Sequence, residues 1–254
     1  MAKVLVIPDI HLKPYIFDYA NVIMKKFKLT QAVFIGDLVD DWDKENDIDL
    51  YKNTINRAIR FKKQYPDSLY CWGNHEAGYF TDCWSCSGNS KLYRRDIRLL
   101  LQKYENEVQP QYIHYIDDCL FSHAGLSKDI MSYIESSNDN ITASYIAELF
   151  NDTAFDDIGE YNSLLWLRPG FGTEYYSKYV QVVGHTPVTS IQNNDNVWFV
   201  DTFSTYSNGL NYGNNEFMII DTITYTVDCV QVTGNKVITT KTLTGRSTWS
   251  NKID

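Results

Sequence analysis

Short apolar segments that alternate with helical patterns fill the first hundred residues and restrict the fold most strongly. Residues 3–7, 32–35 and 68–72 read as buried strands, because strands covered on both faces lose their hydrophobic alternation. Amphipathic helical patterns separate them at 15–27 and 47–65. The order strand, helix, strand, helix, strand is typical of an α/β fold built on a parallel sheet.

The remaining sequence adds helical patterns and then becomes rich in strands. Helices are expected at 92–105 and, in two pieces, at 128–150, with a hairpin at 112–122 between them. Further strands are expected at 180–183, 197–203, 217–221, 225–231 and 236–243. The chain shows no internal repeat and no linker with a shift in composition. We therefore predict one domain over residues 1–254, an α/β half followed by a mostly β half that closes a second sheet.

The composition, the net charge and the lengths of the apolar stretches argue against several classes of protein. The chain has 254 residues, of which 44% are hydrophobic and 22% charged, as in an ordinary globular protein. Its net charge of -9 argues against non-specific binding to nucleic acid or anionic membranes. A phosphate-bearing substrate is compatible with this charge, because bound divalent cations would reverse the local field. No stretch approaches a membrane span or a secretory signal, so a cytoplasmic location is expected.

The cysteines do not suggest a disulfide framework, because their number is odd in a chain of this length. The five are Cys71, Cys83, Cys86, Cys119 and Cys229. Cys83 and Cys86 form a lone CxxC, and a structural zinc site would need two further ligands. Reduced thiols are the main expectation, with a local redox or metal role for this pair as the alternative.

Potential metal ligands follow the ends of the predicted strands, where open α/β sheets place their sites. They are Asp9, His11, Asp37, Asn74, His123 and His185. Carboxylate, imidazole and amide oxygen together suit Mn, Fe or Zn. Six ligands exceed one tetrahedral site, and they suit two ions that share a carboxylate and lower the pKa of a bridging water.

Each of these residues alone has an ordinary structural interpretation. A single histidine of this set could belong to the core or to a loop. His114, inside an alternating strand, is expected to be a surface or packing residue. Asp9 and His11 are two positions apart, so extended backbone would point both side chains in the same direction.

Taken together, however, these residues belong to five short motifs that follow one another along the chain. They are DIH at 9–11, GDLVD at 36–40, GNHE at 73–76, SHAG at 122–125 and GHTP at 184–187. This set closely resembles the calcineurin-like metallophosphoesterase superfamily, and more narrowly its phosphoprotein-phosphatase branch with bacterial and phage serine/threonine phosphatases. The resemblance implies a four-layer α-β-β-α sandwich, in which helices flank two mixed β-sheets. It also implies two divalent ions, with Mn expected and Fe or Zn as alternatives.

The resemblance assigns a metal role to each candidate ligand. Asp9 and His11 would hold the first ion, and Asp37 would bridge both ions. The second ion would be completed by Asn74, His123 and His185.

Three further residues receive catalytic roles from the resemblance. His75 would be the general acid that protonates the leaving oxygen or stabilises its charge. Asp40 would orient His75, although a turn-capping role is the alternative. Arg168, in the LWLR segment, would bind phosphate oxygens of the substrate, with a structural ion pair as the alternative.

One position departs from the family pattern. The family usually reads GDxxDRG, with an arginine that grips phosphate, whereas Asp41 follows Asp40 here. A replacement cation could come from Lys91, Arg94 or Arg95.

The function implied by the resemblance is a dimetal phosphohydrolase. A metal-bridging hydroxide would attack the phosphorus of a phosphomonoester, on phosphoserine or phosphothreonine of a protein or on a small molecule. Alternatives are a dinucleoside polyphosphate hydrolase, and a nucleic-acid end phosphatase or cyclic phosphodiesterase, which the net charge disfavours. A non-catalytic metal-binding scaffold of the same fold is the alternative from another class. The full ligand set together with His75 favours an enzyme, while the sequence says nothing of the oligomeric state.

Overall fold

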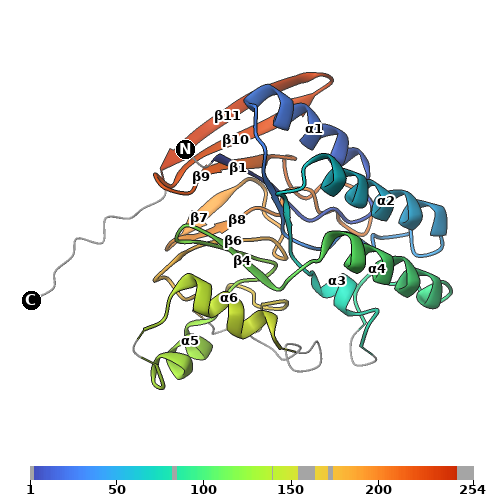
Figure 1. Ribbon diagram of the computed structural model, residues 1–254. Coiled ribbons are helices and arrows are strands. Elements are labelled where there is room, and N and C mark those ends of the chain that lie inside the picture. Colours follow the sequence, from blue (N-terminus) through green and yellow to red (C-terminus); the bar gives the residue numbers. More distant parts are fainter. Residues whose placement is uncertain (1–2, 82–84, 139, 154–163, 171–173, 245–254) are drawn as a thin grey trace, which may run out of the picture.

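Two mixed β-sheets pack against each other in the computed structural model, and helices cover them from outside (Figure 1). The structure describes residues 3–81, 85–138, 140–153, 164–170 and 174–244. The first sheet has the order β11-β10-β9-β1-β2-β3. Its strands are β1 (Lys3–Ile7), β2 (Ala32–Phe34), β3 (Leu69–Tyr70), β9 (Phe217–Asp221), β10 (Thr226–Thr233) and β11 (Lys236–Thr244). The predicted parallel arrangement of β1, β2 and β3 is confirmed.

The second sheet is made by the middle of the chain, in the order β4-β5-β6-β8-β7. Its strands are β4 (Ile113–Ile116), β5 (Cys119–Ser122), β6 (Val180–Val183), β7 (Gln192–Asn194) and β8 (Val197–Phe199). The three central strands β5, β6 and β8 run parallel, with antiparallel strands at both edges. The sequence did not predict β7, because its three polar residues are all exposed and show no strand pattern.

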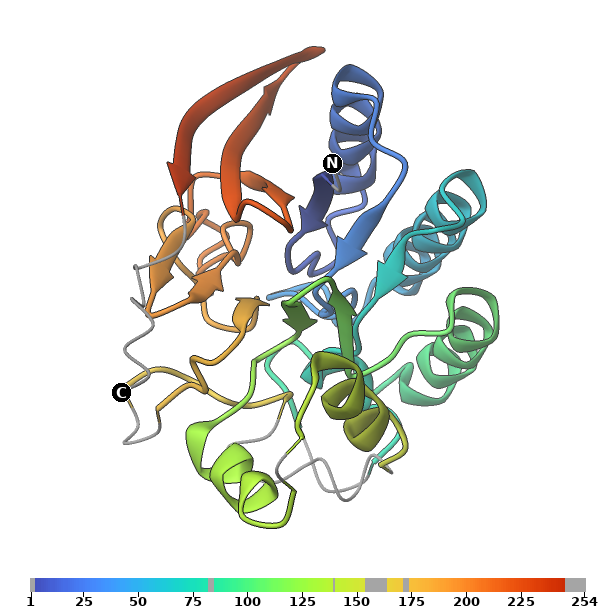
Figure 2. The same cartoon turned by 60° about the vertical axis from the view of Figure 1, so that its left-hand side comes forward.

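The last three strands return to the first sheet, which corrects one expectation. The C-terminal β half was expected to close a second sheet, but β9 pairs antiparallel with β1 and carries β10 and β11 with it. Figure 2 shows the β10–β11 hairpin beside the N-terminal strand and helix. The reason is burial. All five residues of β9 are buried, and the interior position between β1 and β10 provides this burial.

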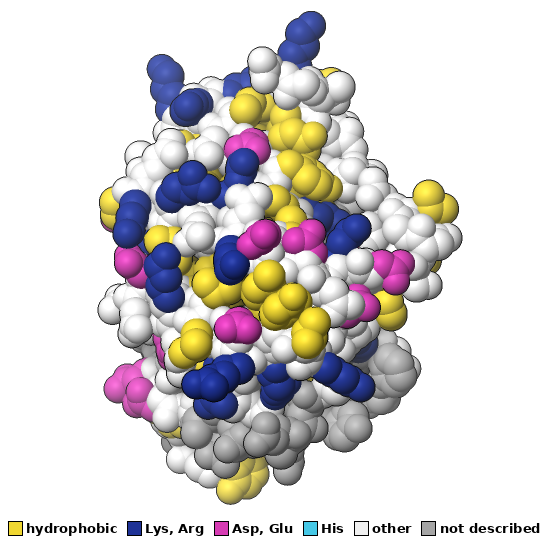
Figure 3. Space-filling view, turned by 90° about the vertical axis from the view of Figure 1, so that its right-hand side faces the viewer, with side chains coloured by type: hydrophobic (Ala, Val, Ile, Leu, Met, Phe, Trp, Pro, Cys, Tyr) yellow, Lys and Arg dark blue, Asp and Glu magenta, His cyan; other side chains and the backbone are white. Residues whose placement is uncertain are grey.

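Helices α1 (Tyr15–Phe27), α2 (Ile48–Gln64) and α4 (Arg94–Val108) lie on the outer side of the first sheet, while α5 (Lys128–Glu135) and α6 (Ala143–Asn151) lie beside the second (Figure 1). The short helix α3 (Asn74–Ala77) follows β3. Figure 3 faces the side of α1, α2 and α4 and shows many Lys and Arg side chains, as expected for solvated helix faces. No helix among the described residues has the length and apolar character needed to cross a membrane.

Strand β1 explains why the first sheet lacks hydrophobic alternation. Val4 and Val6 belong to the apolar cluster between the two sheets, whereas Leu5 and Ile7 belong to the cluster beneath the helices. All four side chains are buried. A strand with a core on each side must be apolar at every position, and its polar residues are therefore displaced to the loop that follows it.

Candidate functional site

The loops that follow five parallel strands meet at one edge of the two sheets. The loop after β1 carries Asp9 and His11, the loop after β2 carries Asp37, and α3 after β3 begins with Asn74 and His75. From the second sheet, His123 follows β5 and His185 follows β6. The carboxyl ends of parallel strands share one edge, so residues far apart in the sequence become neighbours there.

His123 is the centre of one group of potential ligands. Its Nε2 lies 2.8 Å from Asn74 Oδ1, 3.1 Å from His185 Nδ1 and 3.3 Å from Asp37 Oδ2. Its Nδ1 donates a hydrogen bond to the Ile35 carbonyl at 2.8 Å. In the neutral form that a metal ligand must take, this ring would turn a lone pair on Nε2 toward two oxygen acceptors, an arrangement that is favourable around a cation.

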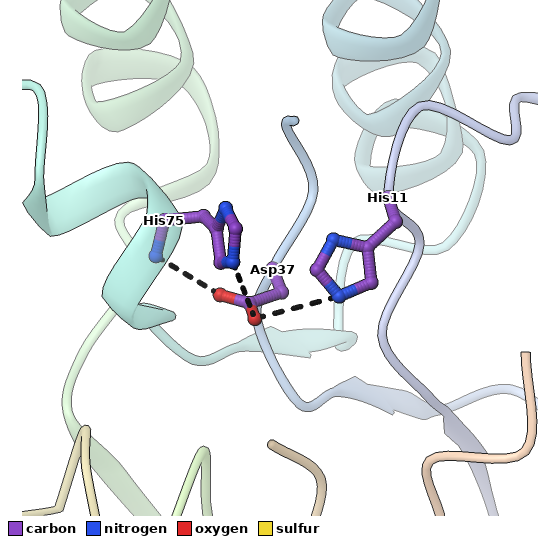
Figure 4. A group of neighbouring side chains, drawn as sticks. All are labelled: His11, Asp37 and His75. Atoms are coloured by element: carbon purple, nitrogen blue, oxygen red, sulfur yellow. Dashed lines mark hydrogen bonds and ion pairs between the residues drawn. The ribbon is translucent and has the colours of Figure 1, made fainter. Parts of the chain in front are cut away.

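Asp37 joins this group to a second one, which contains His11 and His75 (Figure 4). Asp37 Oδ2 lies 3.6 Å from His11 Nε2 and 3.9 Å from His75 Nε2. His11 Nδ1 donates to the Asp40 carbonyl at 2.9 Å, which leaves Nε2 as the electron-pair donor. Burial lowers the pKa of His11 to about 4 and keeps the ring neutral. Asp37 is the one residue common to both groups, the position that a bridging ligand needs.

Asp9 lies next to these groups, although its carboxylate is part of neither. Asp9 Oδ2 accepts the backbone N–H of His185 at 2.9 Å, while its Oδ1 is buried without a hydrogen-bond partner. His185 Nε2 is also buried without a partner. Orphaned polar atoms are costly in a protein interior, so Asp9 Oδ1 fits a metal ion as its missing partner. A Cβ on Gly184 would stand 2.0 Å from Asp9 Oδ1, so only glycine admits the carboxylate here.

The loop after β1 does not have the extended backbone that the sequence suggested. His11 has a positive φ of 43°, and the N–H groups of Ile10 and His11 both donate to the Asp37 carbonyl, at 2.8 and 2.9 Å. The argument that a spacing of two aligns Asp9 with His11 is therefore wrong. The loop wraps around the Asp37 carbonyl instead, and this brings His11 to the Asp37 carboxylate.

His75 is held from behind by Asp40. His75 Nδ1 donates to Asp40 Oδ2 at 3.0 Å, and Asp40 is completely buried. Burial lowers the pKa of His75, but Asp37 and Asp40 outweigh it and raise the value to about 9. The hydroxyls of Tyr51 and Tyr79 donate to the other oxygen of Asp40, at 2.7 and 2.6 Å. These two roles were not predicted, because the position of a tyrosine in a helix or loop pattern does not show which group its hydroxyl will contact.

Glu76 supports the loop that carries Asp37. Its Oε1 accepts the N–H groups of Leu38 and Val39, at 2.7 and 3.0 Å, and its Oε2 accepts the N–H of Gly73 at 3.0 Å. Glu76 is 1% exposed, so water cannot replace these bonds. A Cβ on Gly73 would stand 2.2 Å from the Asp37 nitrogen. The absence of a side chain at Gly73 therefore lets the two ligand loops approach each other this closely.

We expect Glu76→Ala to lower the free energy of unfolding by about 3–5 kcal/mol, because it leaves three buried N–H groups without an acceptor. Glu76→Gln should cost less, since the amide oxygen can still serve Leu38 and Val39. Urea unfolding of the metal-free proteins measures both, with the exposed Glu105→Ala as the control. A loss below about 1 kcal/mol for Glu76→Ala would contradict the supporting role.

A pocket of about 410 Å³ opens beside the ligand groups and contains Arg168. Arg168 Nη1 donates to the His185 carbonyl at 2.8 Å, which fixes the guanidinium next to the site. Among the described residues that line this pocket, Arg168 is the only lysine or arginine. Arg94 instead donates to the carbonyls of Gly78 and Thr81. Lys91, Arg94 and Arg95 are not among the residues that line the pocket.

Several residues outside the two ligand groups make structural hydrogen bonds. His114 is buried, and its Nε2 donates to the Tyr70 carbonyl at 2.8 Å, as a packing residue would. Asp201 accepts the N–H and the hydroxyl of Ser204, at 3.1 and 2.7 Å. Cys86 Sγ lies 3.3 Å from Asn74 Nδ2, so it helps to orient the Asn74 amide. Cys83, its CxxC partner, lies outside the described residues.

Comparisons with known proteins place this geometry in a family. A family model described as calcineurin-like phosphoesterase matches residues 2–228. The structure of a cold-active protein-tyrosine phosphatase from a psychrophilic Shewanella species is similar, with 17% identity and a TM-score of 0.59 over 95% of this chain and 81% of that one. A second structure of a cold-active protein tyrosine phosphatase gives 17% identity and a TM-score of 0.58, over 94% and 78% of the two chains. No curated protein sequence matches. Both structural likenesses support the fold of two mixed sheets flanked by helices.

Proposed function

The chain belongs to the calcineurin-like phosphoesterase family, and from this premise we propose that it is a phosphomonoesterase that uses two divalent ions. It is a phosphoester hydrolase by family, and the family depends on two metals. One observation carries the finer proposal: Asp37 stands between two groups of ligands, and Arg168 and His75 line the pocket beside them. This is the arrangement needed to bind a phosphate, activate water and protonate a leaving oxygen.

The proposed ligands fit divalent ions by their chemistry. Asp9, His11 and Asp37 would hold the first ion, and Asp37 with Asn74, His123 and His185 would hold the second. Nitrogen and oxygen donors of this kind suit Mn²⁺, with Fe or Zn as alternatives. When bound, the ions would neutralise phosphate charge and make hydroxide available from water at neutral pH.

The remaining steps belong to the side chains that line the pocket. Arg168 would bind the phosphate oxygens, because its guanidinium is fixed at the His185 carbonyl and faces the pocket. His75 would give its Nε2 proton to the leaving oxygen, and Asp40 would keep the ring in the required orientation through Nδ1. The two tyrosine hydroxyls on Asp40 would prevent that carboxylate from rotating away.

The substrate would be a phosphomonoester on a protein or on a small molecule. The two similar structures are described as protein-tyrosine phosphatases, which supports a phosphoprotein substrate. The presence of Arg168 as the only lysine or arginine among the described lining residues suits one terminal phosphate. A polyphosphate chain, as in a dinucleoside polyphosphate, would need more positive charge along its length.

Removal of metal tests the proposal directly. We expect hydrolysis of p-nitrophenyl phosphate with Mn²⁺, a loss of at least a hundredfold after chelation, and recovery when Mn²⁺ is added back. Elemental analysis of the active protein should find two ions per chain. Absence of metal-dependent turnover, together with absence of bound metal, would favour the non-catalytic scaffold and reject the proposal.

A further inference from the structure

Asp41 occupies the position of the family's phosphate-gripping arginine, and its contacts give it another use. Asp41 Oδ2 lies 3.1 Å from Lys13 Nζ. Asp41 Oδ1 accepts the N–H of Trp42 at 3.0 Å and the hydroxyl of Thr205 at 2.8 Å. Lys13 is 8% exposed and also donates to the His11 carbonyl. The Asp41 carboxylate is therefore paired with the Lys13 ammonium group, and it joins the loop after β2 to the loop after β8.

These two joined loops place aromatic side chains in the pocket. Trp42 comes from the first loop, and Tyr206 and Tyr212 come from the second. Trp42 is 42% exposed and Tyr206 is 49% exposed, so large ring surfaces remain uncovered. The rings of Tyr206 and Tyr212 lie 5.0 Å apart. We call these three residues the aromatic rim.

The aromatic rim is held in place before any substrate arrives. Backbone hydrogen bonds run from Tyr206 N to the Leu210 carbonyl at 2.9 Å and from Tyr212 N to the Ser204 carbonyl at 2.8 Å. They fold residues 204–212 into a small hairpin, which Asp41 attaches to the Trp42 loop through Thr205. This fixed backbone and the ring contact between Tyr206 and Tyr212 reduce the conformational entropy that is lost when a flat ligand binds.

We propose that the aromatic rim binds the planar ring of an aryl phosphomonoester, so that the enzyme prefers aryl to alkyl phosphates. This inference rests on the proposed function and names its class of substrate. The same pocket contains Arg168 for the phosphate and His75 for the leaving oxygen, and the aromatic rim also lines it, so a ring bonded to that oxygen would enter a space bordered by the rim. Stacked or edge-to-face rings attract each other beyond the burial of their surface, and a serine or threonine side chain offers no such partner.

The reaction proceeds with water as the only co-reactant. Hydroxide derived from water forms a bond to phosphorus, and the bond between phosphorus and the phenolic oxygen breaks. The electron pair of that bond remains on the phenolic oxygen, which takes the proton from His75 Nε2. The products are inorganic phosphate and a phenol, and His75 regains its proton from solvent.

The test compares two peptides of one sequence that carry either phosphotyrosine or phosphoserine at the same position. For Trp42→Ala and Tyr206→Ala with Mn²⁺, we expect kcat/KM for the phosphotyrosine peptide to fall about three- to tenfold, mainly through KM. The loss for the phosphoserine peptide should be at least threefold smaller. Trp42→Phe should retain most of the preference, because it keeps a ring. Tyr133→Ala is the matched control, since Tyr133 is 78% exposed on α5 and does not line the pocket.

Free phosphotyrosine and a nucleoside 5′-monophosphate complete the comparison. Equal relative losses for free phosphotyrosine and its peptide support recognition of the ring itself, whereas a loss confined to the peptides shows that the rim binds flanking chain and overturns the inference. Equal losses for both peptides, or a preference for the nucleotide, overturn it as well. In those cases hydrolysis persists and the proposed function stands. Failure to hydrolyse any of these esters or p-nitrophenyl phosphate rejects the proposed function, and this inference with it.

Discussion

Replacement of His75 by alanine is expected to reduce kcat for an alkyl phosphate by two to four orders of magnitude, the usual contribution of general acid catalysis. The loss for p-nitrophenyl phosphate should be far smaller, because p-nitrophenolate leaves without needing a proton. His75 Nδ1 is fixed on Asp40, so Nε2 is the nitrogen that can reach the leaving oxygen. Steady-state kinetics with a series of esters that differ in leaving-group pKa measures this effect. The kcat of the variant should fall more steeply with rising leaving-group pKa than the kcat of the wild-type protein.

Metal content separates this role from an alternative that the geometry allows. His75 Nε2 lies 3.9 Å from Asp37 Oδ2 and belongs to one of the two ligand groups. If His75 is the acid, His75→Ala still binds two ions, and only the kinetics change. If the variant loses one ion and slows equally on all esters, His75 is a ligand and the acid role is wrong. His114→Gln is the matched control for the removal of a buried histidine, because His114 lies outside the site.

Asp37→Asn is expected to lower kcat by at least about three orders of magnitude, since loss of a bridging carboxylate removes several kcal/mol of stabilisation at both ions. Asp37 is shared by the two ligand groups, so one substitution affects both sites. Isothermal titration with Mn²⁺ should show the loss of tight binding. Turnover of p-nitrophenyl phosphate at saturating Mn²⁺ measures the catalytic loss.

Thermal unfolding distinguishes a loss of metal binding from a loss of fold. A ligand that binds only the native state raises Tm, so wild-type protein should gain stability when Mn²⁺ replaces chelator. Asp37→Asn should lose most of that gain. Its Tm in chelator should fall as well, because burial raises the pKa of the Asp37 carboxyl but His123 and His75 outweigh it and hold that pKa well below its usual range, so the ionised carboxylate stabilises the metal-free protein. An undiminished gain in Tm with Mn²⁺ would contradict the bridging role. Asp67→Asn, at an exposed carboxylate, is the control.

The fold and the place of the site could be predicted from local patterns. The uninterrupted apolar run of β1 indicated a strand between two cores, and Val4 and Leu5 indeed face opposite clusters. Amphipathic periodicity located α1 and α2 to within a residue or two. Short motifs at strand ends indicated which side chains would meet, because the edge of a parallel sheet gathers the loops that follow its strands.

The support of the site could not be predicted, because it comes from residues whose sequence context is ordinary. Tyr51 lies on the buried face of α2, where an aromatic residue signals packing, yet its hydroxyl reaches Asp40. Lys13 follows a ligand motif and gives no hint that it pairs with Asp41. Such contacts depend on how α2 and the loops pack in three dimensions, and no periodicity or short motif encodes that packing. Glu76 closes the GNHE motif, and its sequence context does not show that it accepts three backbone N–H groups.

The pairing of β1 with β9 has a consequence for the order in which the protein is made. β1 is synthesised long before its antiparallel neighbour β9, which follows only after about two hundred more residues. Until β9 leaves the ribosome, the strand that leads to Asp9 has one open edge, and contacts this distant in sequence form slowly. The nascent chain can therefore assemble β1, β2 and β3 early, but the loop that carries Asp9 and His11 acquires its finished framework only after β9 has been made. Metal loading should follow the synthesis of β9, and a nascent protein arrested before residue 217 should not retain the ions.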